Sequence, residues 1–226
     1  MSSSDFLRKN LNQHSIKNIV SKVMDRDIAR AVYNVILVLE QTYPKLTFEL
    51  IPRLMLTEII AQLKRQYPKY SKEFTTVLPT SFIRPDGGLL YALNERGDRR
   101  LILVSEVKRQ GTNDQRELEG LPQQAQGNAI ERLGKNLIGV RAIFKNEGAL
   151  PFVCFGSGHD FKEDSSIVDR VKTMNEFFPL NKLFIEKDFL PFEPVSMFFR
   201  YEVWTADEMA EIMLQIAKRS IEYTFI

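Results

Sequence analysis

The sequence predicts an α/β fold: a single domain with a central mixed β-sheet flanked by helices. Two observations predict it. Segments with apolar residues at helical spacing alternate along the chain with short runs that are apolar at almost every position, which is typical of strands buried on both faces. The chain has 226 residues, enough for one sizeable core. We therefore expect residues 1–226 to form one domain, with an N-terminal helical segment over residues 1–40.

Each element is predicted from its own pattern. Helical periodicity covers residues 15–41, and Pro44 interrupts it. The periodicity returns over residues 53–66. The apolar runs at residues 89–95 and 100–110 are separated by a polar turn and predict a hairpin. The remaining predicted elements are a strand at 76–83, a loop at 111–126, a helix at 127–147, a strand at 150–158, a helix at 165–178, a short strand at 181–189, a strand at 195–204 and a closing helix at 205–223 with Thr205 as its N-cap.

The composition excludes several kinds of site. The single cysteine, Cys154, lies in the apolar run LPFVCFG, so the chain forms no internal disulfide and no thiolate zinc cluster. We interpret it as a buried apolar residue rather than a nucleophile. Two histidines, His14 and His159, leave a serine or cysteine triad open but make a multi-histidine metal site hard to build. If the protein is an enzyme, carboxylates and lysine are expected to carry its chemistry.

Location and charge are less informative. The N-terminus lacks an apolar signal core, and the longest uncharged apolar stretch, AVYNVILVL, is too short to cross a bilayer. We therefore expect a cytoplasmic protein with no membrane partner. The net charge of +2 neither indicates nor excludes a nucleic-acid partner, because acidic patches elsewhere can balance a basic cleft.

The strand at residues 100–110, RLILVSEVKRQ, ends in charge. Its first half is apolar, but Glu106 and Lys108 follow two residues apart, so both point to the same side with Cα atoms about 6.5–7 Å apart. Asp86 lies one hairpin earlier, before two glycines in RPDGG, where the backbone is expected to turn. If the two strands pair, two carboxylates and one lysine converge at one end of the sheet.

Such a group fits phosphodiester hydrolysis. Mg²⁺ typically takes one or two carboxylates from a protein, so Asp86 and Glu106 are candidate ligands, with the main-chain carbonyl of Val107 as a further one. Lys108 is placed to orient or deprotonate an attacking water and to stabilise developing charge. The pattern alone is weak, because PDGG is typical of ordinary turns and Glu-X-Lys is common on solvated strands. The change from buried apolar residues to charged residues within one strand is what favours a functional site.

Two segments together carry a family resemblance. PDGG…SEVKRQG is similar to the signature of PD-(D/E)xK nucleases. The more specific segment is QGNAIERLGKN, residues 126–136, which resembles the recognition segment of EcoRI-type type II restriction endonucleases, where Gly-Asn-Ala-X-Glu-Arg reads an AATT core. Upstream YPKLTFE and downstream LPFVCFGSGHDF resemble their counterparts in the same order, so the similarity covers about residues 40–220. It implies a catalytic and DNA-recognition core over residues 79–160.

The resemblance also implies residue roles. Asp86, Glu106 and Lys108 would form the catalytic centre, with Mg²⁺ as cofactor. The expected contacts to the inner bases are made by Asn128, Ala129, Glu131 and Arg132. These side chains suit the task, because asparagine matches the donor and acceptor on adenine and small apolar groups meet thymine methyls. The expected phosphate contacts are Lys135 and Arg84. The other expected DNA-contacting residues are Gln110, Gln124, Ala125, Gln126 and Arg170.

The sequence departs from the family pattern at the outer base pair. The family has Met and Ala before Gly-Asn-Ala; here Ala125 keeps one position, while Gln124 and Gln126 are replacements. Arg170 matches one family arginine, but Thr173 stands where a second is expected, and the chain lacks an insertion after residue 165. We therefore expect a site of the form N-AATT-N′ whose flanking pair differs from that of EcoRI or is degenerate. Glu58 is a candidate for the additional acidic ligand that some relatives carry.

The function implied is that of a homodimeric, Mg²⁺-dependent type II restriction endonuclease acting on double-stranded DNA. It would cut both strands of a palindrome and leave 5′-phosphate ends with a 5′ AATT overhang. One alternative is a structure-selective PD-(D/E)xK nuclease of repair or recombination, which would need no base-reading segment. Another is a DNA-binding relative that does not cleave, in which one of the three catalytic residues should be missing.

Overall fold

A five-stranded mixed sheet forms the centre of the molecule. The computed structural model describes residues 25–76, 78–109, 116–122, 128–158, 161, 166–189 and 191–225. The strands lie in the order β1-β4-β5-β6-β7, antiparallel from β1 to β5 and parallel from β5 to β7. Their bounds are β1 (Thr47–Ile51), β4 (Leu89–Leu93), β5 (Arg99–Arg109), β6 (Phe152–Ser157) and β7 (Ser196–Arg200).

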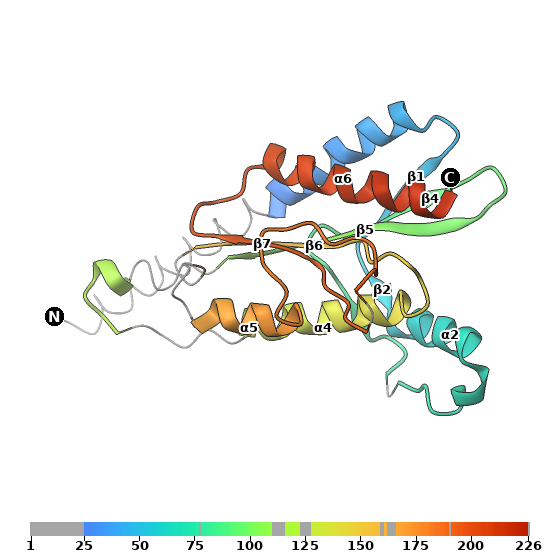
Figure 1. Cartoon of the computed structure of the whole chain (residues 1–226), viewed down its shortest axis with the longest axis horizontal. Coiled ribbons are helices and arrows are strands. Elements are labelled where there is room, and N and C mark those ends of the chain that lie inside the picture. Colours follow the sequence, from blue (N-terminus) through green and yellow to red (C-terminus); the bar gives the residue numbers. More distant parts are fainter. Residues whose placement is uncertain are drawn as a thin grey trace.

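Helices cover both faces of this sheet (Figure 1). One face packs against α6 (Ala206–Phe225) and the helix at residues 25–42. The other face packs against α2 (Leu56–Gln66), α4 (Asn128–Ile143) and α5 (Ser166–Met174). The predicted α/β fold is thereby confirmed. Within the described ranges, no helix combines the length and apolar content needed to cross a lipid bilayer.

Several predicted boundaries are wrong. The segment after Pro44 forms the edge strand β1, which the sequence analysis did not predict. The predicted strand at 76–83 shortens to β3 (Phe82–Ile83), which pairs with β2 (Leu54–Met55) just before α2. The predicted strand at 181–189 makes only an isolated bridge at Glu186.

The residues after α5 protect the outer edge of the sheet. Asn181 donates to the carbonyl of Phe199 and accepts from its amide, at 3.2 and 2.8 Å. Asn175 accepts a hydrogen bond from the amide of Val195 just before β7, at 2.8 Å. These side chains satisfy backbone groups of an edge strand that would otherwise be open to pairing with another chain.

Strand β5 contains a β-bulge in its apolar half. Leu90 of β4 lies opposite Leu103, but the next residue, Tyr91, lies opposite Leu101. Ile102 is therefore an extra residue without its own partner on β4. As a result Ile102 and Leu103 both pack into the core beneath α6, although neighbours on a regular strand face opposite sides.

The bulge decides which way the charged end of β5 points. Leu101 and Val104 are three residues apart, yet both pack into the core beneath α4. Alternation continuing from Val104 places Glu106 and Lys108 on the α4 side as well. Without the extra residue, these two side chains would face the apolar core beneath α6.

Helix α6 begins with a complete capping box. The Oγ1 of Thr205, predicted as the N-cap, accepts from the amide of Glu208 at 3.2 Å, and the Glu208 carboxylate accepts from the amide of Thr205 at 2.9 Å. Arg200 at the end of β7 also donates to this carboxylate, at 2.7 Å. The hydrogen bonds from Arg200 and Thr205 lower the pKa of Glu208 to about 2.

We expect Glu208→Ala to lower the free energy of unfolding by about 1 kcal/mol at pH 7, the usual cost of losing a helix cap. Because the folded-state pKa is depressed, the stabilisation by the carboxylate is complete above the ordinary value of 4.5 and is lost as pH falls towards about 2. Urea unfolding at pH 7 and pH 3 should therefore show a smaller difference from the wild type at pH 3. Glu211→Ala, exposed on the same helix, is the control and should show no such pH dependence.

Candidate active site

The turn before β4 is held against β5. The amide of Gly87 donates to the carbonyl of Ser105 at 2.9 Å, and the amide of Gly88, at φ +78°, donates to the carbonyl of Pro85 at 3.1 Å. A side chain at Gly87 has no room, because a Cβ atom there would lie 2.1 Å from Ser105 Oγ and 2.9 Å from Ile28 Cδ1. The glycine therefore lets the turn approach the strand closely.

This approach places Asp86 beside the charged end of β5. The Asp86 amide donates to Glu106 Oε2 at 3.0 Å, and the Val107 amide donates to Asp86 Oδ2 at 3.3 Å. The two carboxylates that the sequence analysis grouped together thus share one local hydrogen-bond network. A carboxylate that accepts backbone amides is fixed in orientation, as a metal ligand must be.

Three oxygens converge on the ammonium of Lys108. It donates to Asp86 Oδ2 at 2.8 Å, to the main-chain carbonyl of Val107 at 3.0 Å and to Glu106 Oε1. Burial alone would lower the pKa of Lys108, but the carboxylates of Glu106 and Asp86 together raise it above its ordinary value. The group is therefore a cation held by hard oxygen donors.

Glu106 is an ionisable group inside the core. It is 1% exposed, and burial raises its pKa despite the opposing effect of Lys108. Cys154, which lies opposite it on β6, is also fully buried, and burial raises the pKa of its thiol well above the ordinary value. Cys154 thus stays a protonated thiol at neutral pH, which confirms its interpretation as a buried residue.

The sequence analysis missed one member of this group. Asn136 on α4 is 5% exposed, and its Nδ2 donates to Glu106 Oε1 and Oε2 at 3.2 and 3.3 Å. A signal was present in the sequence. Asn136 lies on the helix face that buries Leu133, Leu137 and Val140, where an amide needs a polar partner in the core.

The residues expected to contact DNA lie on several elements. Glu131, Arg132 and Lys135 are exposed on α4, whose first residue is Asn128. Two further exposed arginines are Arg84, in the segment leading to the Asp86 turn, and Arg170 on α5. The predictions for Gln110, Gln124, Ala125 and Gln126, and for the side chains of Asn128 and Ala129, lie outside the described residues.

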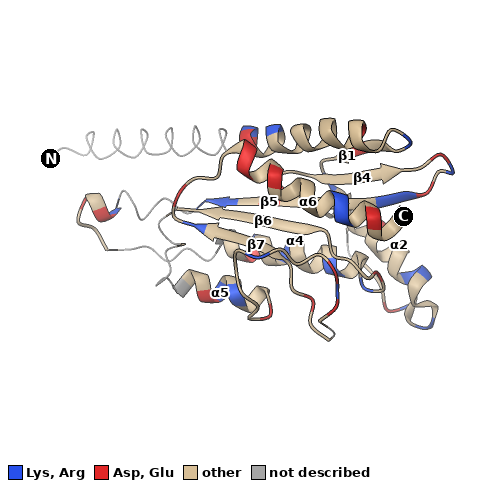
Figure 2. Cartoon of the chain, turned by 45° about the horizontal axis from the view of Figure 1, so that its top comes forward, with Lys and Arg blue, Asp and Glu red and all other residues tan. Residues whose placement is uncertain are grey.

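Basic residues end two parallel strands at the same edge of the sheet. Arg109 is the last residue of β5 and Arg200 the last of β7, and the charged view shows both strand ends in blue (Figure 2). Arg200 already has partners in the fold. Its Cζ atom lies 3.7 Å from the Trp204 ring centroid, and its guanidinium forms an ion pair with Glu208. Arg109 is exposed next to Lys108, so positive charge borders the candidate site.

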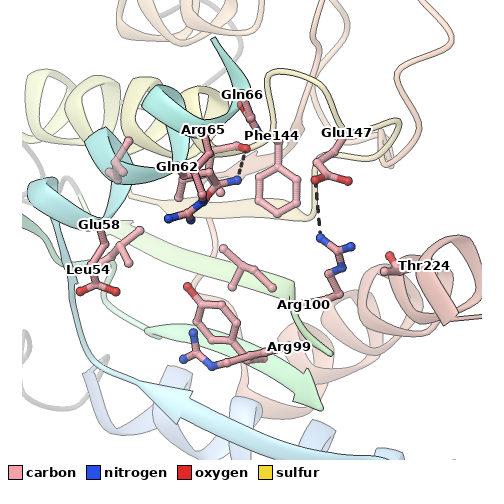
Figure 3. A pocket seen from close by; sticks show the side chains of 14 residues that line it. Leu54, Glu58, Gln62, Arg65, Gln66, Arg99, Arg100, Phe144, Glu147 and Thr224 are labelled. Carbon is pink, nitrogen blue, oxygen red and sulfur yellow. Dashed lines mark hydrogen bonds and ion pairs between the residues drawn. The ribbon is translucent and has the colours of Figure 1, made fainter. Parts of the chain in front are cut away.

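Glu58 does not join the group. It lies in the first turn of α2 and accepts a hydrogen bond from the Met55 amide at 3.4 Å. It lines a pocket of about 480 Å³ together with Arg99, the first residue of β5 (Figure 3). Lys108 lies near the opposite end of the same strand. Among the described residues, no three carboxylate, histidine or cysteine side chains cluster as metal ligands.

The comparisons with known proteins agree with this geometry. The family model described as restriction endonuclease EcoRI matches residues 12–225. The chain belongs to the EcoRI family of restriction endonucleases. It is thus a type II restriction enzyme, a site-specific deoxyribonuclease.

Two relatives show how far the similarity extends. The type II restriction enzyme RsrI of Cereibacter sphaeroides is 29% identical over an alignment that covers 92% of this chain and 87% of the relative. The type II restriction enzyme EcoRI of Escherichia coli is 31% identical over 58% of this chain and 50% of the relative. The resemblance stated from the GNAIER segment is confirmed at the level of the family.

We expect Gly87→Ala to disturb the site, because its methyl group would overlap Ser105 Oγ and push the turn away from β5. Overpacking of this kind should lower the free energy of unfolding by about 1–3 kcal/mol and slow DNA cleavage. Gly97→Ala is the control. It also strains a turn, at φ +83°, but its Cβ would meet no atom within 4 Å, so cleavage should be unchanged. A Gly87→Ala enzyme that cleaves plasmid DNA at the wild-type rate would contradict the close approach.

Proposed function

We propose that this enzyme is a homodimer that hydrolyses both strands of double-stranded DNA, with Mg²⁺ as cofactor, at a palindrome with an AATT core. The products are 5′-phosphate ends with a 5′ AATT overhang. The observation that carries the proposal is the convergence of Asp86, Glu106 and the Val107 carbonyl on one cationic group.

The donor set suits a magnesium ion. All three groups are hard oxygens, the ligands that Mg²⁺ prefers, and two of them carry negative charge. Asp86, Glu106 and the carbonyl of Val107 would hold the ion, leaving its other positions to water and a phosphate oxygen. When bound, the ion would supply Lewis-acid polarisation of the phosphate and a more acidic water.

Lys108 is the group that this chain supplies to the reacting atoms. Its ammonium lies at the carboxyl end of β5, and its side chain is 11% exposed. There it is placed to orient the attacking water and to offset the negative charge that builds on the phosphate. The Asp86 and Glu106 carboxylates keep this ammonium charged, which suits charge stabilisation better than proton abstraction.

The AATT core rests on the resemblance of the recognition segment. Glu131 and Arg132, two of the residues expected to contact the inner bases, are exposed near the start of α4. Lys135, one turn further along, is a candidate phosphate contact. Gln124 and Gln126 depart from the family pattern, so we propose a flanking pair that differs from that of EcoRI or is degenerate.

The two alternatives have less support. A DNA-binding relative that does not cleave should lack one of Asp86, Glu106 and Lys108, yet all three are present and in mutual contact. A structure-selective nuclease does not need the GNAIER segment. Neither alternative matches the family to which the chain belongs.

The recognition site is tested by cleaving random-sequence duplex DNA with Mg²⁺ and sequencing the ends. We expect ends that begin with 5′-AATT, with flanking pairs other than, or in addition to, G·C. Cleavage of GAATTC alone among AATT-containing hexamers would overturn the proposal for the outer pair. Ends without AATT would overturn the proposal for the core.

We expect Glu106→Gln to bind site-containing DNA but to cleave it more than about a hundredfold more slowly, the scale of losing one charge-stabilising group. The amide keeps the shape of the side chain but removes the negative charge that a metal ligand needs. Gel-shift affinity without metal and single-turnover cleavage with Mg²⁺ measure the two effects separately. Glu147→Gln, a carboxylate near Arg100 at the other end of β5, should cleave normally. A near-normal cleavage rate for Glu106→Gln would show that the catalytic assignment is wrong.

A further inference from the structure

Asn136 is a polar side chain on the buried face of the helix expected to read DNA. It is 5% exposed, and its neighbours on that face, Leu133, Leu137 and Val140, are each at most 1% exposed. An amide among aliphatic side chains costs free energy unless its hydrogen bonds are made. The position therefore calls for a specific partner.

That partner is the carboxylate of Glu106. The Asn136 amide nitrogen lies 3.2 and 3.3 Å from its two oxygens and 3.5 Å from the carbonyl of Arg84. The carbonyl of Arg84 can only accept a hydrogen bond, so the NH₂ group rather than the oxygen of Asn136 must face it. The orientation of the amide thus follows from its surroundings.

Asn136 is also the contact that joins this carboxylate to a different layer of the fold. The other donors to Glu106 are the Asp86 amide, from the turn, and Lys108, from the same strand. Among the contacts of the described residues, Asn136 is the only side chain of α4 that reaches Glu106. A change in the position of α4 relative to the sheet must alter this hydrogen bond.

The carboxyl end of α4 is held by hydrogen bonds with two segments outside the helix. Near its carboxyl end, Lys187 donates to the carbonyl of Phe144, and Arg141 donates to the carbonyl of Glu193 at 2.6 Å. Near its amino end lie the exposed residues expected to contact DNA. Asn136 follows Arg132 by four residues, about 6 Å along the helix axis. It lies between the anchored end and the reading end.

We propose that Asn136 is a positioning residue that couples seating of α4 on DNA to the orientation of the Glu106 carboxylate. Correct seating keeps the amide against both carboxylate oxygens, and Glu106 is then held ready as a ligand. When α4 binds a wrong sequence, it shifts and weakens the hydrogen bonds from Asn136 to Glu106. The cleavage rate therefore differs more between cognate and non-cognate DNA than the binding affinity does. This inference rests on the proposed function, in which Glu106 is a metal ligand.

The test compares Asn136→Leu with Val140→Ala. Leucine keeps the size of the side chain but removes both donors, whereas Val140→Ala weakens packing of the same helix without touching Glu106. For Asn136→Leu we expect Mn²⁺ affinity of the protein–DNA complex, measured by electron paramagnetic resonance, to fall about 10–100-fold, the usual effect of removing a partner of a metal ligand. Gel-shift affinity for the cognate site without metal should change less than about twofold, on the reasoning that phosphate and base contacts remain.

The second readout is discrimination. The ratio of single-turnover rates on the cognate site and on a site with one changed base should fall for Asn136→Leu and stay at the wild-type value for Val140→Ala. A leucine beside a buried carboxylate risks unfolding the chain, so Asn136→Ser, which keeps one donor, is measured in parallel and should give an intermediate Mn²⁺ affinity. Thermal unfolding verifies that each variant is folded at the assay temperature.

The outcomes separate the two proposals. If the wild type cleaves site-specifically, and the folded Asn136 variants match Val140→Ala in Mn²⁺ affinity and discrimination, Asn136 has only a structural role and the inference is overturned. If the wild type itself fails to cleave AATT-containing DNA with Mg²⁺, it is the proposed function that fails.

Discussion

The buried carboxylate of Glu106 constrains the arrangement of everything around it. Ionising a carboxylate that is 1% exposed costs several kcal/mol unless charges and hydrogen bonds compensate it. Here the compensation comes from three parts of the chain: the Lys108 ammonium on the same strand, the Asp86 amide in a turn, and the Asn136 amide on a helix. Removal of any of these would leave a charge in the core short of a partner. The turn, the strand and the helix are therefore tied together by one side chain.

That side chain reaches the right layer only because β5 is irregular. The bulge at Ile102 adds one residue to the apolar half of the strand and so exchanges the faces of all residues that follow. Glu106 then meets Asn136, while Val107 on the opposite face packs into the core beneath α6. A regular strand would turn Lys108 and Glu106 into that apolar core, away from the Asn136 amide on α4 that Glu106 contacts here. The bulge is thus a requirement of the site.

The sequence predicted the parts that depend on local pattern. Helical periodicity found the main helices, and the charged end of an apolar run found Glu106 and Lys108. The bulge could not be predicted from the sequence, because residues 101–104 are all apolar and do not indicate which face of the strand each one occupies. The edge strand β1 was not predicted for a related reason. Its residues are exposed or half-buried, so its apolar pattern is weak. Glu58 was misjudged because its distance from the site is set by tertiary packing of α2, which spacing along the chain does not reveal.

The mixed topology of the sheet explains why these particular segments meet. An antiparallel neighbour begins where β5 ends, so the turn before β4 brings Asp86 to the carboxyl end of β5. A parallel neighbour needs a crossover, and α4 lies in the connection from β5 to β6, so its first turns lie near that same end. The carboxyl ends of parallel strands are where α/β sheets commonly bind ligands. One strand with an antiparallel neighbour on one side and a parallel neighbour on the other therefore joins the turn proposed to be catalytic to the helix proposed to read DNA, and Glu106 lies where the two meet.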